Sequence, residues 1–197
     1  MSFNFKQIPI ALVCARNMNR SMESHSLLKI HGYNIESYGT SSVVKLPSPS
    51  GFDSNIYDFN TPYLEIAEDL KKKDFKFYSQ SGVLELLERN HLIKSTPQKF
   101  QDSKKFFPLI ITFEIRVYDE VVKHLEQNST NSVIPIYVIN FETVDTNEEA
   151  FISSQLVLKL IQQIENNGSQ WEENLEIIID NFQKETSRKI TFNILFF

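Results

Sequence analysis

A cysteine, an arginine and a serine near the N-terminus have the types and the spacing that a thiol-dependent phosphatase requires. Cys14 is the only cysteine of the chain, Arg20 follows six positions later, and Ser21 comes directly after the arginine. A phosphate monoester is a dianion and an attacking thiolate adds another negative charge, so the protein must supply positive potential around the phosphate. The Cys-x5-Arg-Ser spacing therefore predicts a nucleophilic thiolate at Cys14 and a phosphate-binding guanidinium at Arg20.

The residues that follow Cys14 are predicted to form a phosphate-binding loop. Five intervening residues let the chain bend round one phosphate, and a loop that opens a helix can turn successive backbone N–H groups inward. The helix dipole adds partial positive charge, which favours the thiolate form of a cysteine, and Ser21 is placed to donate a hydrogen bond to the sulfur. The predicted phosphate-binding residues are Ala15, Arg16, Asn17, Met18, Asn19, Arg20 and Ser21.

The alternative interpretation of Cys14 is a buried apolar residue at the end of a strand, because free cysteines are often buried. The surrounding sequence favours the catalytic interpretation. Residues 8–13 are an apolar run that predicts a buried parallel strand, and residues 21–30 show a helical pattern. Strand, loop and helix thus follow one another in the order that an anion-binding loop needs.

Length and composition are those of an ordinary globular protein. The 197 residues are 41% hydrophobic and 23% charged, which predicts one domain with a sizeable core. The net charge of −5 argues against a general nucleic-acid-binding surface. A single cysteine allows no internal disulfide, as is typical of a reducing compartment. No secretory signal is apparent, and no apolar run approaches the ~20 residues of a membrane span, so we expect a soluble intracellular protein.

Alternating strand and helix patterns predict an α/β fold. Strands are expected at residues 8–14, 33–38, 108–113, 132–141 and 189–197, and helices at 21–30, 61–74, 79–90, 114–127, 148–166 and 171–186, with a turn at 128–131. This alternation predicts a three-layer sandwich, with a mainly parallel central sheet of about five strands and helices on both faces. Ligands bind at the carboxyl ends of the strands in such sheets, where Cys14 falls.

The segment 43–60 interrupts this alternation. It is rich in proline and serine around residues 45–51, which predicts an exposed loop or short hairpin laid over the sheet. We therefore expect a single phosphatase domain over residues 1–197 that carries a small cap insertion at about 43–60.

The strand predicted at 132–141 should bring a general acid to the same edge as Cys14. A serine alkoxide is a poor leaving group, so a phosphoserine enzyme needs a proton donor at the departing oxygen. Four carboxylates follow this strand: Glu142, Asp145, Glu148 and Glu149. Asp145 is the candidate acid, which would then take a proton from water in the second half-reaction. The alternative role of any of the four is a helix N-cap or a first-turn charge.

Six short stretches together resemble one known family. They are VCARN at 13–17, NRSME at 19–23, VKLP at 44–47, NIYDF at 55–59, RVYD at 116–119 and DTNEEA at 145–150. In type and order they are similar to the serine phosphatase of the RNA polymerase II carboxy-terminal domain, which is associated with the cleavage and polyadenylation machinery. That family looks like the low-molecular-weight tyrosine phosphatase fold with an additional cap, and the resemblance covers nearly the whole chain.

The resemblance implies roles for particular residues. Cys14 would be the nucleophile, Arg20 the phosphate clamp and Asp145 the general acid. The implied substrate is a phosphoserine followed by a cis proline, at the fifth position of the polymerase tail heptad. Only about 10–30% of such bonds are cis in a flexible peptide, so the pocket must fit a bent backbone. The substrate-binding residues expected there are Met18, Lys45, Leu46 and Pro47, whose alternative role is packing between cap and core.

The resemblance also implies the setting of the reaction. It implies no cofactor and no metal, a nuclear location, a role in transcription and mRNA 3′-end processing, and a symplekin-like scaffold as partner. Direct nucleic-acid or membrane binding is not expected. The chain departs from the family pattern at three places: Arg16 replaces a small polar residue, Ile115 an acid, and Phe141-Glu142 a Val-Asp pair. None of these changes removes a catalytic group.

Four alternatives are weighed against this prediction. A low-molecular-weight tyrosine phosphatase usually carries a second loop cysteine and an Asp-Pro acid motif, where this chain has Met18 and Thr146. An arsenate reductase of the same fold needs further cysteines. A non-catalytic scaffold would not need Cys14, Arg20 and Asp145. A metal-dependent phosphatase is disfavoured because the four histidines show no paired ligand spacing; these are His25, His31, His91 and His124.

Overall fold

In the part of the chain that the structure describes, the central sheet has five strands in the order β2-β1-β5-β6-β7. The structure is a computed structural model that describes residues 3–128 and 133–196. The strands are β1 (Ile10–Cys14), β2 (Ile35–Gly39), β5 (Leu109–Thr112), β6 (Pro135–Phe141) and β7 (Ile190–Phe196). The first four are parallel to one another and β7 runs antiparallel to β6. The mainly parallel sheet predicted from the sequence is confirmed.

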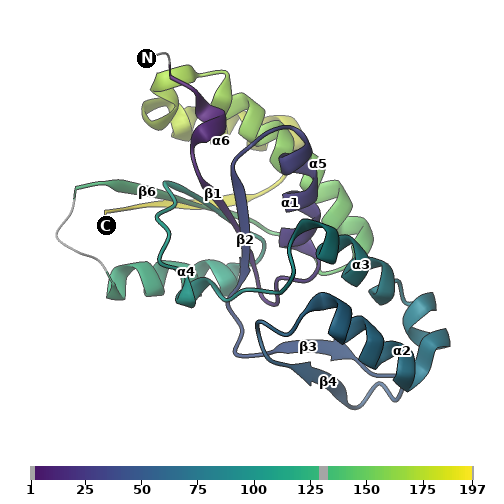
Figure 1. Cartoon of the computed structure of the whole chain (residues 1–197). Helices are drawn as coiled ribbons and strands as arrows, with labels where there is room; N and C mark the ends of the chain where they lie inside the picture. The colour runs from purple at the N-terminus through teal and green to yellow at the C-terminus, as the bar shows by residue number, and fades with distance from the viewer. Residues whose placement is uncertain (1–2, 129–132, 197) are drawn as a thin grey trace.

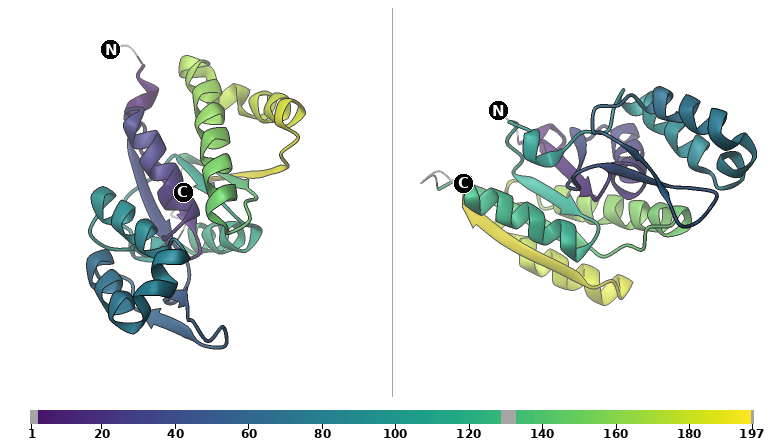
Figure 2. Two further views of the ribbon diagram at one scale, coloured as in Figure 1. Left: turned by 90° about the vertical axis from the view of Figure 1, so that its right-hand side faces the viewer. Right: turned by 90° about the horizontal axis from the view of Figure 1, so that it is seen from below.

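Helices cover both faces of this sheet (Figure 1, Figure 2). The helices on one face are α1 (Arg20–Ile30), α5 (Asn147–Glu165) and α6 (Trp171–Thr186), and the helix on the other is α4 (Ile115–Gln127). Side chains alternate along a strand, so Leu12 packs into the core under the first group while Val13 packs into the core under α4. Burial of β1 on both faces explains its uninterrupted apolar sequence.

A separate unit lies beside the carboxyl ends of the parallel strands (Figure 1). It consists of an antiparallel hairpin, β3 (Val44–Pro47) with β4 (Ser54–Tyr57), and of α2 (Tyr63–Gln80) and α3 (Val83–Ile93). Its own apolar core joins Leu46 of the hairpin to Leu70 of α2 and Leu87 of α3, and includes Met18 and Met22. The hairpin was expected to lie over the sheet. That expectation was wrong, because its apolar side chains are buried against α2 and α3 instead.

Element boundaries agree with the sequence-based expectations to within a few residues, with one exception. The helix expected at 61–74 does stop at Asp74, whose φ is −161° and ψ is 88°, but a further helical segment that was not expected follows this break, and α2 ends at Gln80. The Asp74 carboxylate accepts a hydrogen bond from the Phe77 backbone N–H at 2.9 Å and so restarts the helix. Short 3-10 turns occur at Phe5–Gln7, Phe100–Asp102 and Gly168–Gln170.

Some expectations fall on parts of the chain that the structure does not describe. The predicted turn at 128–131, the first residue of the strand expected at 132–141 and the last residue of the strand expected at 189–197 lie wholly or partly outside the described residues. Within residues 3–128 and 133–196, no helix combines the length and the apolar character that crossing a membrane requires.

Candidate active site

The predicted phosphate-binding loop connects the carboxyl end of β1 to the first turn of α1. Cys14 is the last residue of β1 and Arg20 the first of α1, and both are only 3% exposed. Asn17 bends the chain with a φ of 54°, a left-handed conformation that asparagine tolerates better than most residues. The sulfur of Cys14 therefore lies at the helix N-terminus, where backbone N–H groups and the helix dipole favour an anion.

Ser21 is the hydrogen-bond partner of the sulfur. Its Oγ lies 3.0 Å from Sγ of Cys14 and accepts a hydrogen bond from Nδ2 of Asn17 at 3.2 Å. Because the hydroxyl oxygen already accepts from the amide, its proton is free to point at the sulfur. A hydroxyl oriented in this way stabilises a thiolate and the leaving thiolate of a phosphocysteine.

Side chains of α2 and α3 hold the backbone carbonyls of the loop. The hydroxyl of Tyr63 donates to the Asn17 carbonyl at 2.7 Å, and Nδ2 of Asn90 donates to the Met18 carbonyl at 2.8 Å. Burial raises the pKa of Tyr63 well above its usual value, so the hydroxyl keeps the proton that it donates. Among the described residues, no acceptor takes a hydrogen bond from the backbone N–H groups of residues 16–19. With the carbonyls held outward, these amides remain available for an anion.

The end of β2 supports the loop from the other side. The backbone N–H groups of Thr40 and Ser41 donate to the Ala15 carbonyl at 3.0 and 2.9 Å. A Cβ at Gly39 would lie 2.8 Å from the Ala15 carbonyl oxygen and 2.9 Å from Cζ of Phe59. Only glycine allows β2 and the loop to approach this closely.

One nitrogen of the Arg20 guanidinium is held by hydrogen bonds and another is not. Its Nη1 donates to Glu114 Oε2 at 2.8 Å and to the Thr143 carbonyl at 2.9 Å. Its Nε is buried, lies 3.4 Å from Oδ1 of Asp145, and makes no hydrogen bond to any described residue. Burial lowers the pKa of Arg20, but the opposite charges of Cys14, Asp145 and Glu114 outweigh this and raise it overall. The guanidinium is thus a permanent cation with a donor left for a phosphate oxygen.

Of the four candidate acids, Asp145 is the one that contacts the loop. Its Oδ1 accepts a hydrogen bond from Nδ2 of Asn19 at 3.2 Å, and its Oδ2 pairs with Nη2 of Arg16. The N-cap of α5 is Thr146, whose hydroxyl accepts from the Glu149 backbone N–H at 3.2 Å. Because Thr146 caps the helix, the carboxylate of Asp145 is left to face the loop.

The other three carboxylates have structural environments. Oε2 of Glu142 accepts hydrogen bonds from the Ile115 backbone N–H and from Nδ2 of Asn140, both at 3.0 Å. Glu149 pairs with Arg188, and Glu148 is an exposed first-turn residue of α5. These are the capping and first-turn roles that the sequence analysis offered as alternatives.

A cleft of about 240 Å³ adjoins Asp145 on the side of the hairpin and α3. Its lining residues come from the loop, from β3, from α3 and the turn before it, and from the start of α5 with the segment before it: Arg16, Met18, Asn19, Leu46, Pro47, Ser81, Val83, Leu86, Asp145 and Asn147. Met18, Leu46 and Pro47 were predicted to bind substrate and do line this cleft. Lys45 was predicted with them, but the cleft does not include it; its side chain is exposed and its carbonyl accepts a hydrogen bond from Arg16 at 2.7 Å.

Sequence reasoning missed several residues of the site. Glu114 directly follows the strand predicted at 108–113, so the rule that selected the acids after β6 could also have found it. Tyr63 and Asn90 bind backbone carbonyls, which are the same in every residue, so no local pattern reveals them. Val83 and Leu86 of the cleft belong to a helix whose placement depends on the tertiary fold.

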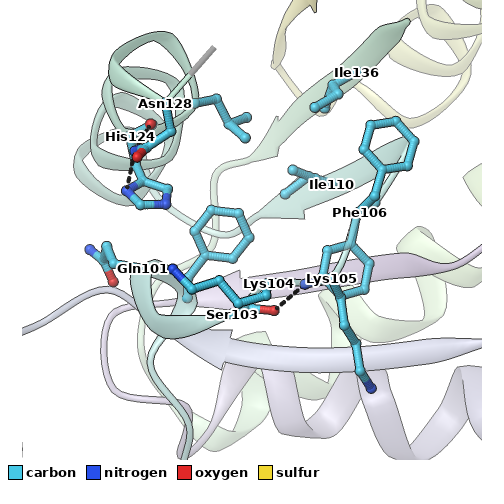
Figure 3. A pocket seen from close by; sticks show the side chains of 12 residues that line it. Gln101, Ser103, Lys104, Lys105, Phe106, Ile110, His124, Asn128 and Ile136 are labelled. Atoms are coloured by element: carbon cyan, nitrogen blue, oxygen red, sulfur yellow. Dashed lines mark hydrogen bonds between the residues drawn. The ribbon is translucent and has the colours of Figure 1, made fainter. Parts of the chain in front are cut away.

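A second hollow, of about 300 Å³, lies at the other end of the sheet (Figure 3). Its walls come from residues 100–107, from α4 with His124 and Asn128, and from the strand starts at Ile110 and Ile136. The amino ends of β5 and β6 are opposite to the edge where Cys14 lies, so this hollow is separate from the site. No group of three or more histidine, cysteine or acidic residues suited to a metal ion occurs in the described parts of the chain.

Comparison with known proteins yields one consistent family. The family model described as Ssu72-like protein matches residues 8–197. Among curated relatives, the RNA polymerase II C-terminal domain phosphatase SSU72 of Xenopus laevis is 39% identical over 188 residues, which cover 95% of this chain and 96% of the relative. The protein of the same name from Dictyostelium discoideum is 42% identical over 192 residues, covering 95% of this chain and 89% of the relative.

Solved structures give the same result at the level of the fold. The serine phosphatase of the RNA polymerase II CTD from Drosophila melanogaster superposes with a TM-score of 0.93 at 38% identity, over 97% of this chain and 100% of that one. Drosophila melanogaster Ssu72 was also solved with Symplekin, bound to a cis peptidomimetic CTD peptide that is phosphorylated on the fifth-position serine. That structure has a TM-score of 0.91 at 38% identity, over 97% and 99% of the two chains.

Proposed function

The chain belongs to the Ssu72-like protein family, and from this premise we propose that it removes phosphate from the fifth-position serine of the RNA polymerase II carboxy-terminal-domain heptad. The reaction proceeds through a phosphocysteine at Cys14. The observation that carries the proposal is the loop itself. It holds a buried sulfur hydrogen-bonded by Ser21, amides at residues 16–19 that have no acceptor among the described residues, and a buried Nε of Arg20 that makes no hydrogen bond to them. A phosphate dianion fits that arrangement of charge and donors.

In the first half-reaction the thiolate of Cys14 attacks phosphorus and the bond from phosphorus to the serine oxygen breaks. The loop amides and Arg20 bind the three non-bridging oxygens and stabilise their developing charge. Asp145, in its protonated form, gives its proton to the serine oxygen as that oxygen departs. The products are a peptide with a free serine hydroxyl and a phosphocysteine at Cys14.

In the second half-reaction water replaces the peptide. Asp145, now a carboxylate, takes a proton from the water, whose oxygen attacks phosphorus while the phosphorus–sulfur bond breaks. The hydrogen bond from Ser21 stabilises the departing thiolate of Cys14. Inorganic phosphate leaves, and the enzyme returns to its starting state.

The cleft beside Asp145 is proposed to bind the proline that follows the phosphoserine. Met18, Leu46, Val83 and Leu86 give it apolar walls, and Pro47 lies at its edge. A cis prolyl bond folds the peptide back sharply, so a proline ring can enter this cleft while the neighbouring phosphate stays in the loop. Lys45, outside the cleft, is proposed to contact the peptide at the rim.

Heptad peptides that carry phosphoserine before a locked cis or a locked trans proline mimic test this proposal. We expect turnover of the cis-locked peptide and essentially none of the trans-locked one, measured as released phosphate under single-turnover conditions. Equal rates for the two peptides would contradict cis selection. A matched phosphotyrosine peptide serves as the control for the tyrosine phosphatase alternative, and its faster hydrolysis would favour that alternative.

The cellular setting follows from the same premise. A Drosophila relative was solved in complex with Symplekin, and we propose that a symplekin-like scaffold also binds this protein. Because the substrate is the tail of RNA polymerase II, the protein acts in the nucleus, in transcription and mRNA 3′-end processing. We further propose that the chain is one phosphatase domain, whose cap comprises the hairpin at 43–60 together with α2 and α3, because these elements share one core.

A further inference from the structure

Arg16 links three parts of the site that are distant in sequence. It belongs to the phosphate-binding loop, its Nη1 donates to the carbonyl of Lys45 on β3 at 2.7 Å, and its Nη2 pairs with Oδ2 of Asp145. The side chain of Arg16 is 34% exposed and that of Asp145 is 27% exposed. A planar guanidinium that makes two such contacts fixes the distance between the acid-bearing segment and the cap.

The contact between Arg16 and Asp145 is important because Arg20, the other cation beside Asp145, is also expected to bind the phosphate. Arg20 lies 3.4 Å from Oδ1 of Asp145, and its Nε is the donor left for a phosphate oxygen. When phosphate binds, Arg20 is engaged by the substrate, and its hold on Asp145 weakens. Arg16 stays in place because its Nη1 is fixed to a backbone carbonyl that does not depend on the substrate.

We propose that Arg16 is a positioning residue that holds Asp145 over the oxygen of the leaving serine. This inference rests on the proposed function, and it assigns to a loop residue a task separate from binding phosphate. Both terminal nitrogens of Arg16 are directed away from the loop, one to Asp145 and one to β3, so its guanidinium does not serve the phosphate directly. Its effect on kcat/KM comes from the step in which Asp145 gives a proton to the oxygen of the leaving serine.

How strongly the loss of kcat/KM depends on the leaving group distinguishes a role in positioning Asp145 from a role in binding phosphate. A serine alkoxide requires protonation as it leaves, whereas p-nitrophenolate departs readily without a proton. Arg16→Gln is therefore expected to lower kcat/KM for a phosphoserine-proline heptad peptide roughly tenfold, because misplacing a catalytic group by about 1 Å has effects up to ~10²-fold. kcat/KM for p-nitrophenyl phosphate should change less than about twofold. Arg16→Lys keeps a cation, but its single ammonium group cannot reach both Asp145 and the Lys45 carbonyl as the planar guanidinium does. This variant should therefore keep more peptide activity than Arg16→Gln and less than the parent protein.

A double-mutant cycle tests whether Arg16 acts through Asp145. In the Asp145→Asn background no proton is available to position, so adding Arg16→Gln should cause no further loss on the peptide. Arg188→Gln is the matched control: it removes an arginine that pairs with Glu149, four residues after Asp145, and should leave both substrates unaffected. Thermal unfolding of each variant checks that the fold is retained.

Four results would overturn the proposal. Equal losses on the peptide and on p-nitrophenyl phosphate in Arg16→Gln would mean that the guanidinium acts on the phosphate. A further tenfold loss on top of Asp145→Asn would mean that it acts independently of the acid. If Asp145→Asn itself showed no dependence on the leaving group, the proposed acid would fail together with its positioning residue. If Asp145→Asn lowered kcat/KM for the peptide selectively but Arg16→Gln left it unchanged, the role of Arg16 would be wrong while that of Asp145 would stand.

Discussion

Cys14→Ser abolishes hydrolysis of a phosphoserine-proline heptad peptide, while the protein remains folded and still binds the peptide. The hydroxyl of serine stays protonated at neutral pH, and the side chain that hydrogen-bonds to position 14 in the described structure, the hydroxyl of Ser21, is not a base. Arg20, whose charge also acts on this position, is a cation and cannot accept a proton. Without a thiolate no phosphoenzyme forms, so we expect turnover to fall to the background rate. Released phosphate, followed over many enzyme equivalents, measures this directly.

The same variant separates chemistry from binding. The loop amides and the free donor of Arg20 do not involve the sulfur, so the affinity for the phosphopeptide should remain within a few-fold of that of the parent protein. Replacing sulfur by oxygen at one buried position changes little volume, and the unfolding midpoint should move by only a few degrees. Sustained turnover in a folded Cys14→Ser protein would contradict the thiol mechanism, and loss of binding would place the phosphate elsewhere.

Asp145→Asn produces the second-largest effect, and in the first half-reaction the loss is confined to substrates whose leaving group needs a proton. Asparagine keeps an oxygen that can accept from Asn19 and lie beside Arg20, but it has no acidic proton to give. We expect kcat/KM for the phosphoserine peptide to fall by about 10²–10⁴-fold, which is the usual contribution of a general acid. kcat/KM for p-nitrophenyl phosphate should fall much less, because this parameter reports the first half-reaction and the leaving group is stable as an anion.

Glu148→Gln is the matched control for this variant. Glu148 follows the same strand three residues after Asp145, is equally a carboxylate, and lies exposed in the first turn of α5. Its neutralisation should leave both activities unchanged. If Glu148→Gln lost as much peptide turnover as Asp145→Asn, the assignment of the acid would be wrong, and equal losses on the two substrates would show that Asp145 serves phosphate binding.

The parts of the fold and site that depend on local sequence could be predicted. An apolar run before Cys14 and a helical pattern after Arg20 place both residues at a strand-to-helix turn, whatever surrounds them. The acid-bearing segment after β6 followed from the direction of parallel strands. The boundaries of α6 were predicted without error at Trp171 and Thr186 because its apolar spacing is regular.

Features set by tertiary contacts could not be predicted. The hairpin at 44–57 packs on α2 and α3 because those elements share an apolar core, and its own sequence does not reveal that partner. The direction of the Arg16 side chain depends on where Lys45 and Asp145 meet in space, although the three residues are far apart in sequence.

The most direct test of the central claim is to find the phosphoryl group on the sulfur. A phosphoserine heptad peptide with labelled phosphate is mixed with excess enzyme, the reaction is stopped with alkaline denaturant within one turnover, and the labelled enzyme fragment is identified. We expect the label on the fragment that contains Cys14, and none in the Cys14→Ser variant. Label that passes straight from peptide to free phosphate at every time point, with none on the enzyme, would contradict transfer to Cys14.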